Sequence, residues 1–166
     1  MNKVLKGLAI AALLVTVIGA GAVLYGINTL TPEVEQVSVT QVPAAQQQGV
    51  FDELVRQLEE NTFAGVLLTE DTSNLRAEDC TFVTYTVRFY NRGFFPAEWI
   101  SLEVQLGDGT EILTLADNSA HVLSAGSRGD LSVTLLRRNG EETERKLRTT
   151  CYVFGRQIVF DVPVGA

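Results

Sequence analysis

"VTYTVRFYNRGFFPAEWISLEVQL", residues 83–106, carries the clearest structural signal in this chain of 166 residues. Apolar side chains at Val83, Tyr85, Val87 and Phe89 alternate with polar ones, and a second alternating run follows over residues 100–106. Successive side chains of a β-strand point to opposite faces of the sheet. Each run therefore predicts a strand with one buried face and one solvated face.

Period-two runs broken by turn residues continue from Phe63 to the C-terminus, which predicts an all-β sandwich or barrel over residues 63–166. In "FGRQ", a tight turn at Gly155-Arg156 is expected to pair Cys151 with Phe160 and to turn Cys151 inward. "LLRRNGEETERKL" leaves two interpretations open. It is either a hairpin with the loop Arg138–Gly140 or a crossing between two sheets.

Two stretches resemble known modules. "YTVRFYNRGFFPAEWISLEVQL" resembles the strand, Asn-x-Gly turn, strand unit of immunoglobulin-like β-sandwich modules in bacterial surface proteins, including the CARDB and fibronectin type III-like groups. "VLSAGSRGDLSVTLL" is similar to their strand, Gly-containing turn, strand segment. The resemblance extends over about residues 63–162 and implies an immunoglobulin-like antiparallel β-sandwich. A fold of this kind says little about function.

The same resemblance implies a disulfide between Cys80 and Cys151 that bridges the two sheets. The alternation in the sequence opposes it, because Cys80 has the parity of Phe82 and not of the buried Val83 row. Cys80 would face inward only if its strand begins irregularly. The disulfide and two free thiols therefore both remain open.

The N-terminus carries Lys3 and Lys6, after which no charged residue occurs until Glu33. Residues 7–30 would reach about 36 Å as a helix, enough to cross about 30 Å of hydrocarbon. We therefore expect residues 1–30 to form a cytoplasmic stub and a single-pass signal anchor in the plasma membrane, with the C-terminal domain outside. Ala20-Gly21-Ala22 offers a cleavage site, so a secreted product is the alternative.

Between the anchor and the β domain, residues 31–48 contain two prolines and three consecutive glutamines, which predicts an extracellular spacer. Residues 49–62 then change period. Phe51, Leu54, Val55 and Leu58 fall on one stripe of an amphipathic helix. This helix is expected to dock on its own domain, with a partner-binding stripe as the alternative.

The charge balance argues against nucleic acid as a partner. The chain has 13 basic and 20 acidic residues. Without Lys3 and Lys6, 11 basic residues face 20 acidic ones, a net charge of −9. Phosphate backbones are bound mainly through Lys and Arg, so an acidic domain is a poor candidate.

No catalytic or metal-binding pattern is recognisable. The single histidine, His121, lies within five residues of Asp117 and Ser119, whereas a catalytic triad converges from separate elements. One histidine and two distant cysteines do not form a zinc site without several carboxylates. Glu103 should point to solvent, and the loop acids, Glu111 among them, are expected to be solvated. We therefore predict that the protein binds no cofactor and is not an enzyme.

"GFFPAEW" contributes the one candidate surface, formed by Phe94, Phe95 and Trp99 beside Pro96. Aromatic side chains at a loop either close one end of a sandwich or bind a peptide, glycan or partner protein. The leading expectation is a membrane-anchored, non-enzymatic structural or interaction module with an unidentified partner. A ligand- or glycan-binding domain and an unrecognised hydrolase are the alternatives.

Overall fold

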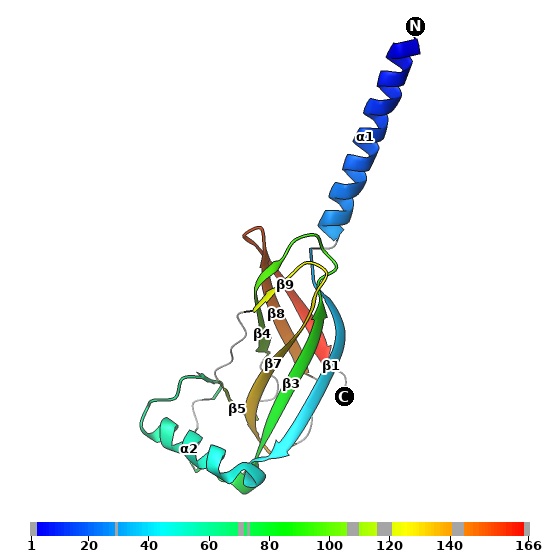
Figure 1. Ribbon diagram of the computed structural model, residues 1–166. Coiled ribbons are helices and arrows are strands. Elements are labelled where there is room, and N and C mark those ends of the chain that lie inside the picture. The colour runs from blue at the N-terminus through cyan, green and yellow to red at the C-terminus, as the bar shows by residue number, and fades with distance from the viewer. Residues whose placement is uncertain are drawn as a thin grey trace.

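Two antiparallel sheets form the body of the protein, as the alternating runs predict. The computed structural model describes residues 3–28, 30–69, 72, 74–105, 110–115, 121–140 and 145–164 (Figure 1). Within them, one sheet has the order β1-β3-β7-β5-β2 and the other β6-β4-β8-β9. The strands are β1 (Glu33–Pro43), β2 (Val66–Leu67), β3 (Cys80–Tyr90), β4 (Ala97–Val104), β5 (Glu111–Thr114), β6 (His121–Leu123), β7 (Arg128–Arg138), β8 (Arg145–Val153) and β9 (Arg156–Val164).

The main core lies between the two sheets. The predicted row on β3 is buried, and it packs with Ile100 and Leu102 of β4 from the facing sheet. β7 adds Leu131, Val133 and Leu135. The polar residues between them point away from this core, so the predicted faces of β3 and β4 are confirmed. The end of the second predicted run, Leu106, lies outside the described residues.

The predicted spacer over residues 31–48 is wrong, because β1 occupies most of it. β1 pairs with β3 from Glu33 to Pro43, setting Val37 opposite Val87 and Val39 opposite Tyr85. A register shift between Val34 and Gln36 breaks the alternation. The sandwich thus begins only a few residues after the N-terminal helix.

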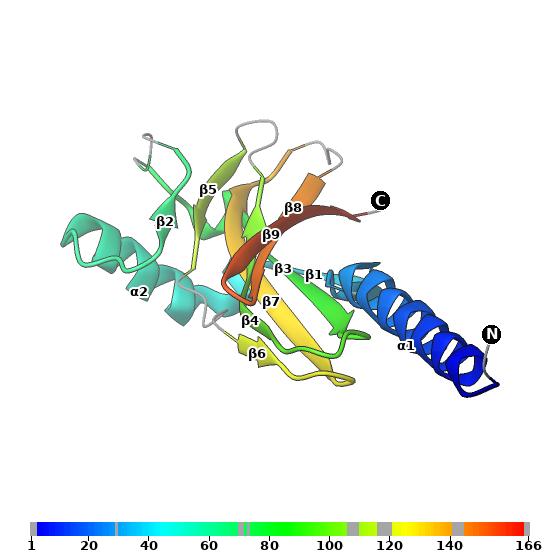
Figure 2. The same cartoon turned by 90° about the horizontal axis from the view of Figure 1, so that it is seen from above.

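The predicted amphipathic helix is confirmed as α2 (Gln48–Glu59), which follows a short 3₁₀ turn, η1 (Ala44–Gln47). Phe51 and Leu54 are buried and cover the outer face of the first sheet at one end. They share a second core with Phe82, Leu136 and Cys80, beside the turn η2 (Ala77–Asp79). Figures 1 and 2 show α2 at the end of the molecule opposite α1 (Lys3–Asn28).

Two connections settle the open questions of register. β7 and β8 belong to different sheets, so residues 139–144 connect the two sheets and the Arg138–Gly140 hairpin is wrong. The turn between β8 and β9 is at Phe154-Gly155, with Cys151 opposite Ile158 and not Phe160. Both turn residues have positive φ, 53° and 69°, as a type I′ turn requires. The shift is two residues, so Cys151 still faces inward and is fully buried.

α1 covers most of the predicted anchor. Its large apolar side chains from Leu8 to Leu24 are exposed to more than half of their possible extent. Within the described residues, no helix combines the length and the apolar character that a membrane span requires.

Candidate functional site

The predicted aromatic residues lie on the surface at the end of the sandwich where α1 joins it. Phe94, Phe95 and Trp99 are exposed by 62%, 39% and 66%, and Phe154 of the β8–β9 turn joins them at 71%. We call these four residues the aromatic end. Closing the sandwich core does not explain them, because a residue that closes a core loses most of its exposure.

A buried asparagine holds the loop that carries Phe94 and Phe95. The Asn91 side chain donates from Nδ2 to the carbonyl oxygens of Phe95 (2.8 Å) and Leu123 (2.9 Å), and its Oδ1 accepts from the Gly93 N–H (2.9 Å). Its backbone exchanges hydrogen bonds with Gly126 and Ser127. Asn91 therefore ties the β3–β4 loop to the β6–β7 turn.

Ring contacts join the aromatic end to the rest of the chain. The Phe95 and Phe154 centroids are 4.1 Å apart, which links the β3–β4 loop to the β8–β9 turn. The Phe94 ring lies 5.1 Å from that of Tyr25, in the last turn of α1. Trp99 sits where β4 shifts register against both β6 and β8. Phe154 and Asn91 were not predicted from the sequence, although an aromatic residue before the turn glycine and the Asn-x-Gly motif were the available signals.

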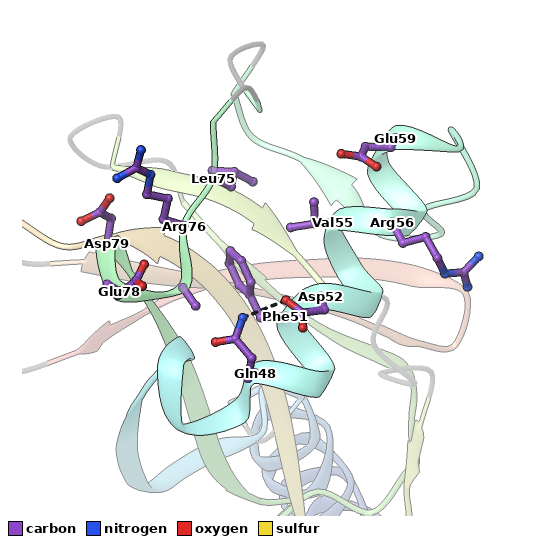
Figure 3. A pocket seen from close by; sticks show the side chains of 11 residues that line it. Gln48, Phe51, Asp52, Val55, Arg56, Glu59, Leu75, Arg76, Glu78 and Asp79 are labelled. Atoms are coloured by element: carbon purple, nitrogen blue, oxygen red, sulfur yellow. Dashed lines mark hydrogen bonds between the residues drawn. The ribbon is translucent and has the colours of Figure 1, made fainter.

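A second feature is an open groove of about 700 Å³ between α2 and the segment 75–79 (Figure 3). Its lining carries Asp52, Glu59, Glu78 and Asp79 together with two arginines. Asp52 accepts a hydrogen bond from Gln48 at 2.8 Å. All four carboxylates are exposed, so the groove is wet, whereas acid catalysis favours a site closed to water.

Charged partners on α2 already engage one of these arginines. Arg56 contacts Glu53 at 2.6 Å and Glu60 at 2.7 Å. It therefore serves the helix surface and does not converge with the carboxylates on a common point. The described residues contain no group of three or more His, Cys, Asp or Glu side chains placed to hold a metal ion.

Of the two alternatives left open for the cysteines, the structure has the free thiols, because Cys80 and Cys151 lie in different cores. Cys80 faces α2 beside Phe82, and Cys151 faces the space between the sheets. Both are free and buried. Burial raises the pKa of each thiol above its usual value of 9.0. Cys80 thus lies on the same face of its strand as Phe82, as the alternation in the sequence predicted.

The remaining candidates divide between exposed and buried positions. Glu103 is exposed as expected. Glu111 is not the solvated loop acid that we predicted, because it is buried on β5 directly opposite the buried Arg137 of β7. Opposite charges on directly paired residues of two neighbouring strands stabilise the pairing of those strands. His121 begins β6, while Asp117 and Ser119 lie outside the described residues.

Comparison with known proteins adds no relative: no family model matches the sequence, and no curated protein is significantly similar to it.

Proposed function

We propose that this chain is a plasma-membrane protein with a single N-terminal anchor that presents an immunoglobulin-like β-sandwich on the outer side, as a non-enzymatic structural or protein-interaction module. The length and hydropathy of the described part of α1 do not by themselves meet the requirement for a membrane span. The proposal takes its support from the surface of α1, from the charges at its two ends and from the strand order.

The surface of α1 is the observation that carries the anchor. Exposed apolar side chains occur on every side of the helix: Leu8, Ile10, Leu13, Leu14, Val15, Val17, Ile18, Val23 and Leu24. A helix that is apolar all round belongs in a core or in a membrane. Lys3 and Lys6 precede this run and Glu33 and Glu35 follow it, the distribution expected when the N-terminus stays in the cytoplasm.

The strand order supports the immunoglobulin-like assignment. The order β1-β3-β7-β5 corresponds to strands A-B-E-D of that fold, and β4-β8-β9 corresponds to C-F-G. β6 departs from it, because it follows β5 in the chain yet pairs with β4 in the other sheet. A fold of this kind does not by itself define a function, so the non-enzymatic role is proposed from the surface described above.

Fractionation and labelling of intact cells test the location. Thr40→Cys places a thiol on the exposed side of β1, while the buried Cys80 and Cys151 of the unchanged protein serve as the control. We expect the protein to stay in the membrane pellet after alkaline washing and Thr40→Cys to react with a membrane-impermeant maleimide. A soluble product that begins near Val23 would show a cleaved signal. A cytosolic protein that stays unlabelled would overturn the proposal.

A ligand- or glycan-binding domain is the second candidate. The exposure of Phe94, Phe95 and Trp99 favours it, because exposed aromatic groups form many carbohydrate and peptide surfaces. Binding of soluble glycans or peptides to the protein in detergent, followed through the emission of Trp99, distinguishes this candidate from a purely structural module.

A further inference from the structure

The aromatic end lies where the anchor enters the domain. Figure 1 shows the β3–β4 loop and the β8–β9 turn at the end of the sandwich from which α1 leaves. Only residues 29–32 separate α1 from β1, a distance of at most about 18 Å. The contact between Phe94 and Tyr25 brings the loop to the last turn of the helix.

Two of the four aromatic residues also adopt a backbone conformation that is costly for them. Trp99 and Phe154 have φ of 50° and 53°, in the left-handed region. The other described non-glycine residues with positive φ are Asn61 and Asn74, and asparagine is the residue that tolerates this region best. Local strain of this kind concentrates at functional sites. At both positions the chain thus places a large exposed aromatic group where a small polar one would be more stable.

We propose that the aromatic end lies in the headgroup region of the bilayer to which α1 anchors the protein, so that the domain rests on the membrane in one orientation. This inference rests on the proposed anchor. Tyr25 lies in the last turn of α1, and Tyr and Trp are the residues that favour the membrane–water interface. The same boundary passes through Phe94, because its ring touches Tyr25.

The charges around the aromatic end fit this environment. The domain as a whole is acidic, which opposes contact with anionic lipid. Near the aromatic end, however, Arg92 pairs with Glu33 at 3.0 Å and Arg128 with Glu35 at 2.8 Å. Within each of these two pairs the opposite charges compensate one another, so the pairs add no net charge to this surface. A second copy of the chain or a glycan would not need the anchor beside the surface, whereas a bilayer contact requires it.

Trp99 supplies the test, because it is the only tryptophan in the chain. The full-length protein is reconstituted into phosphatidylcholine vesicles that carry bromine on the acyl chains close to the glycerol. Bromine quenches tryptophan only at short range. We expect most of the Trp99 emission to be lost and the emission maximum to shift to shorter wavelength. The double variant Phe94→Ser/Phe154→Ser should recover much of the emission while remaining attached to the vesicles.

Moving the fluorophore gives the matched control. Trp99→Phe/Val66→Trp places it on β2, an exposed position beside α2 (Figure 2). We expect this variant to keep its emission in the brominated vesicles.

Vesicle flotation, measured in parallel, separates the two proposals. Protein that floats with unquenched Trp99 would overturn the lipid contact and leave the anchor standing. Emission that is protected from acrylamide but not quenched by bromine would instead assign the surface to a second copy. Protein that does not float would overturn the anchor itself.

Discussion

The apolar side chains at the two ends of the sandwich differ in their exposure to solvent. At the α2 end, Phe51 and Leu54 are 3% and 4% exposed, because the helix lays them on Phe82 and Leu136. At the aromatic end, Phe94 and Phe154 are 62% and 71% exposed. Burying a phenylalanine fully stabilises a protein by about 2 kcal/mol. The α2 end therefore contributes free energy of folding that the exposed rings of the aromatic end do not. The chain itself covers the apolar side chains of the α2 end, whereas the described residues leave the rings of the aromatic end largely exposed.

The residues on the outer face of β3 and β7 change from polar to apolar along the strands. Away from α2 this face carries three cross-strand pairs, Thr84 with Thr134, Thr86 with Ser132, and Arg88 with Asp130, all joined by hydrogen bonds of 2.7–2.9 Å. Under α2 the same face becomes apolar at Phe82 and Leu136. The helix docks where the polar pairs stop.

The largest effect should follow Phe51→Ala. The cavity left under α2 is expected to lower the free energy of unfolding by about 3 kcal/mol. Denaturant unfolding of the full chain in detergent measures it, and faster alkylation of Cys80 than of Cys151 would locate the opening under α2. Val50→Ala, an exposed neighbour on the same helix, is the control. Equal losses for the two variants would contradict a docked α2.

Asn91→Ala should come next and act at the aromatic end. It leaves the carbonyls of Phe95 and Leu123 without their donor, a cost of about 2 kcal/mol. Asn139→Ala is a matched control, because Asn139 also bonds through both side-chain atoms but is exposed. Unfolding midpoints compare the two. A smaller loss for Asn91 than for Asn139 would show that the loop is not held as described.

The elements that could be predicted from the sequence are those with one face buried along their whole length. β3 alternates because one face is always buried, and α2 has a single apolar stripe, so both were predictable. β1 was not, because the shift after Val34 breaks its period and an edge strand leaves even Val39 partly exposed. The only sign was the short run Val37-Ser38-Val39-Thr40.

The candidate site was predictable only in part. Phe94, Phe95 and Trp99 stand together in the sequence, whereas Phe154 reaches them through a turn 55 residues after Trp99. A turn at Gly155-Arg156 would have left Phe154 within the strand. Gly155-Arg156 has the glycine in the first position that a type II′ turn requires, so the sequence pointed to that turn, whereas the positive φ of Phe154 and Gly155 shows a type I′ turn one residue earlier.

Phe154→Asn should separate stability from membrane contact. Asn-Gly is the preferred type I′ sequence, and relief of the left-handed phenylalanine should stabilise the fold by about 1 kcal/mol. The same change removes the most exposed ring of the aromatic end and should reduce quenching by brominated lipid. Gly155→Ala, which introduces strain at φ 69°, should destabilise by a similar amount. A destabilising Phe154→Asn would mean that the ring contact with Phe95 outweighs the strain.

The smallest effect should come from the charged pair between the two ends. Arg88 donates two hydrogen bonds to Asp130 and holds the pKa of that carboxyl below its usual value of 3.8. Such a carboxylate stabilises the fold above its unfolded pKa, and the contribution is lost as the pH falls through the lower folded value. Because both side chains are more than 40% exposed, solvent screens the pair and the change should be slight. Unfolding temperatures of Asp130→Asn and the unchanged protein should therefore differ a little at neutral pH and converge in acid. Thr86→Val, which alters the uncharged neighbouring pair, should give a difference that does not depend on pH; a pH-independent difference for Asp130→Asn as well would show that the residue acts by packing and not by charge.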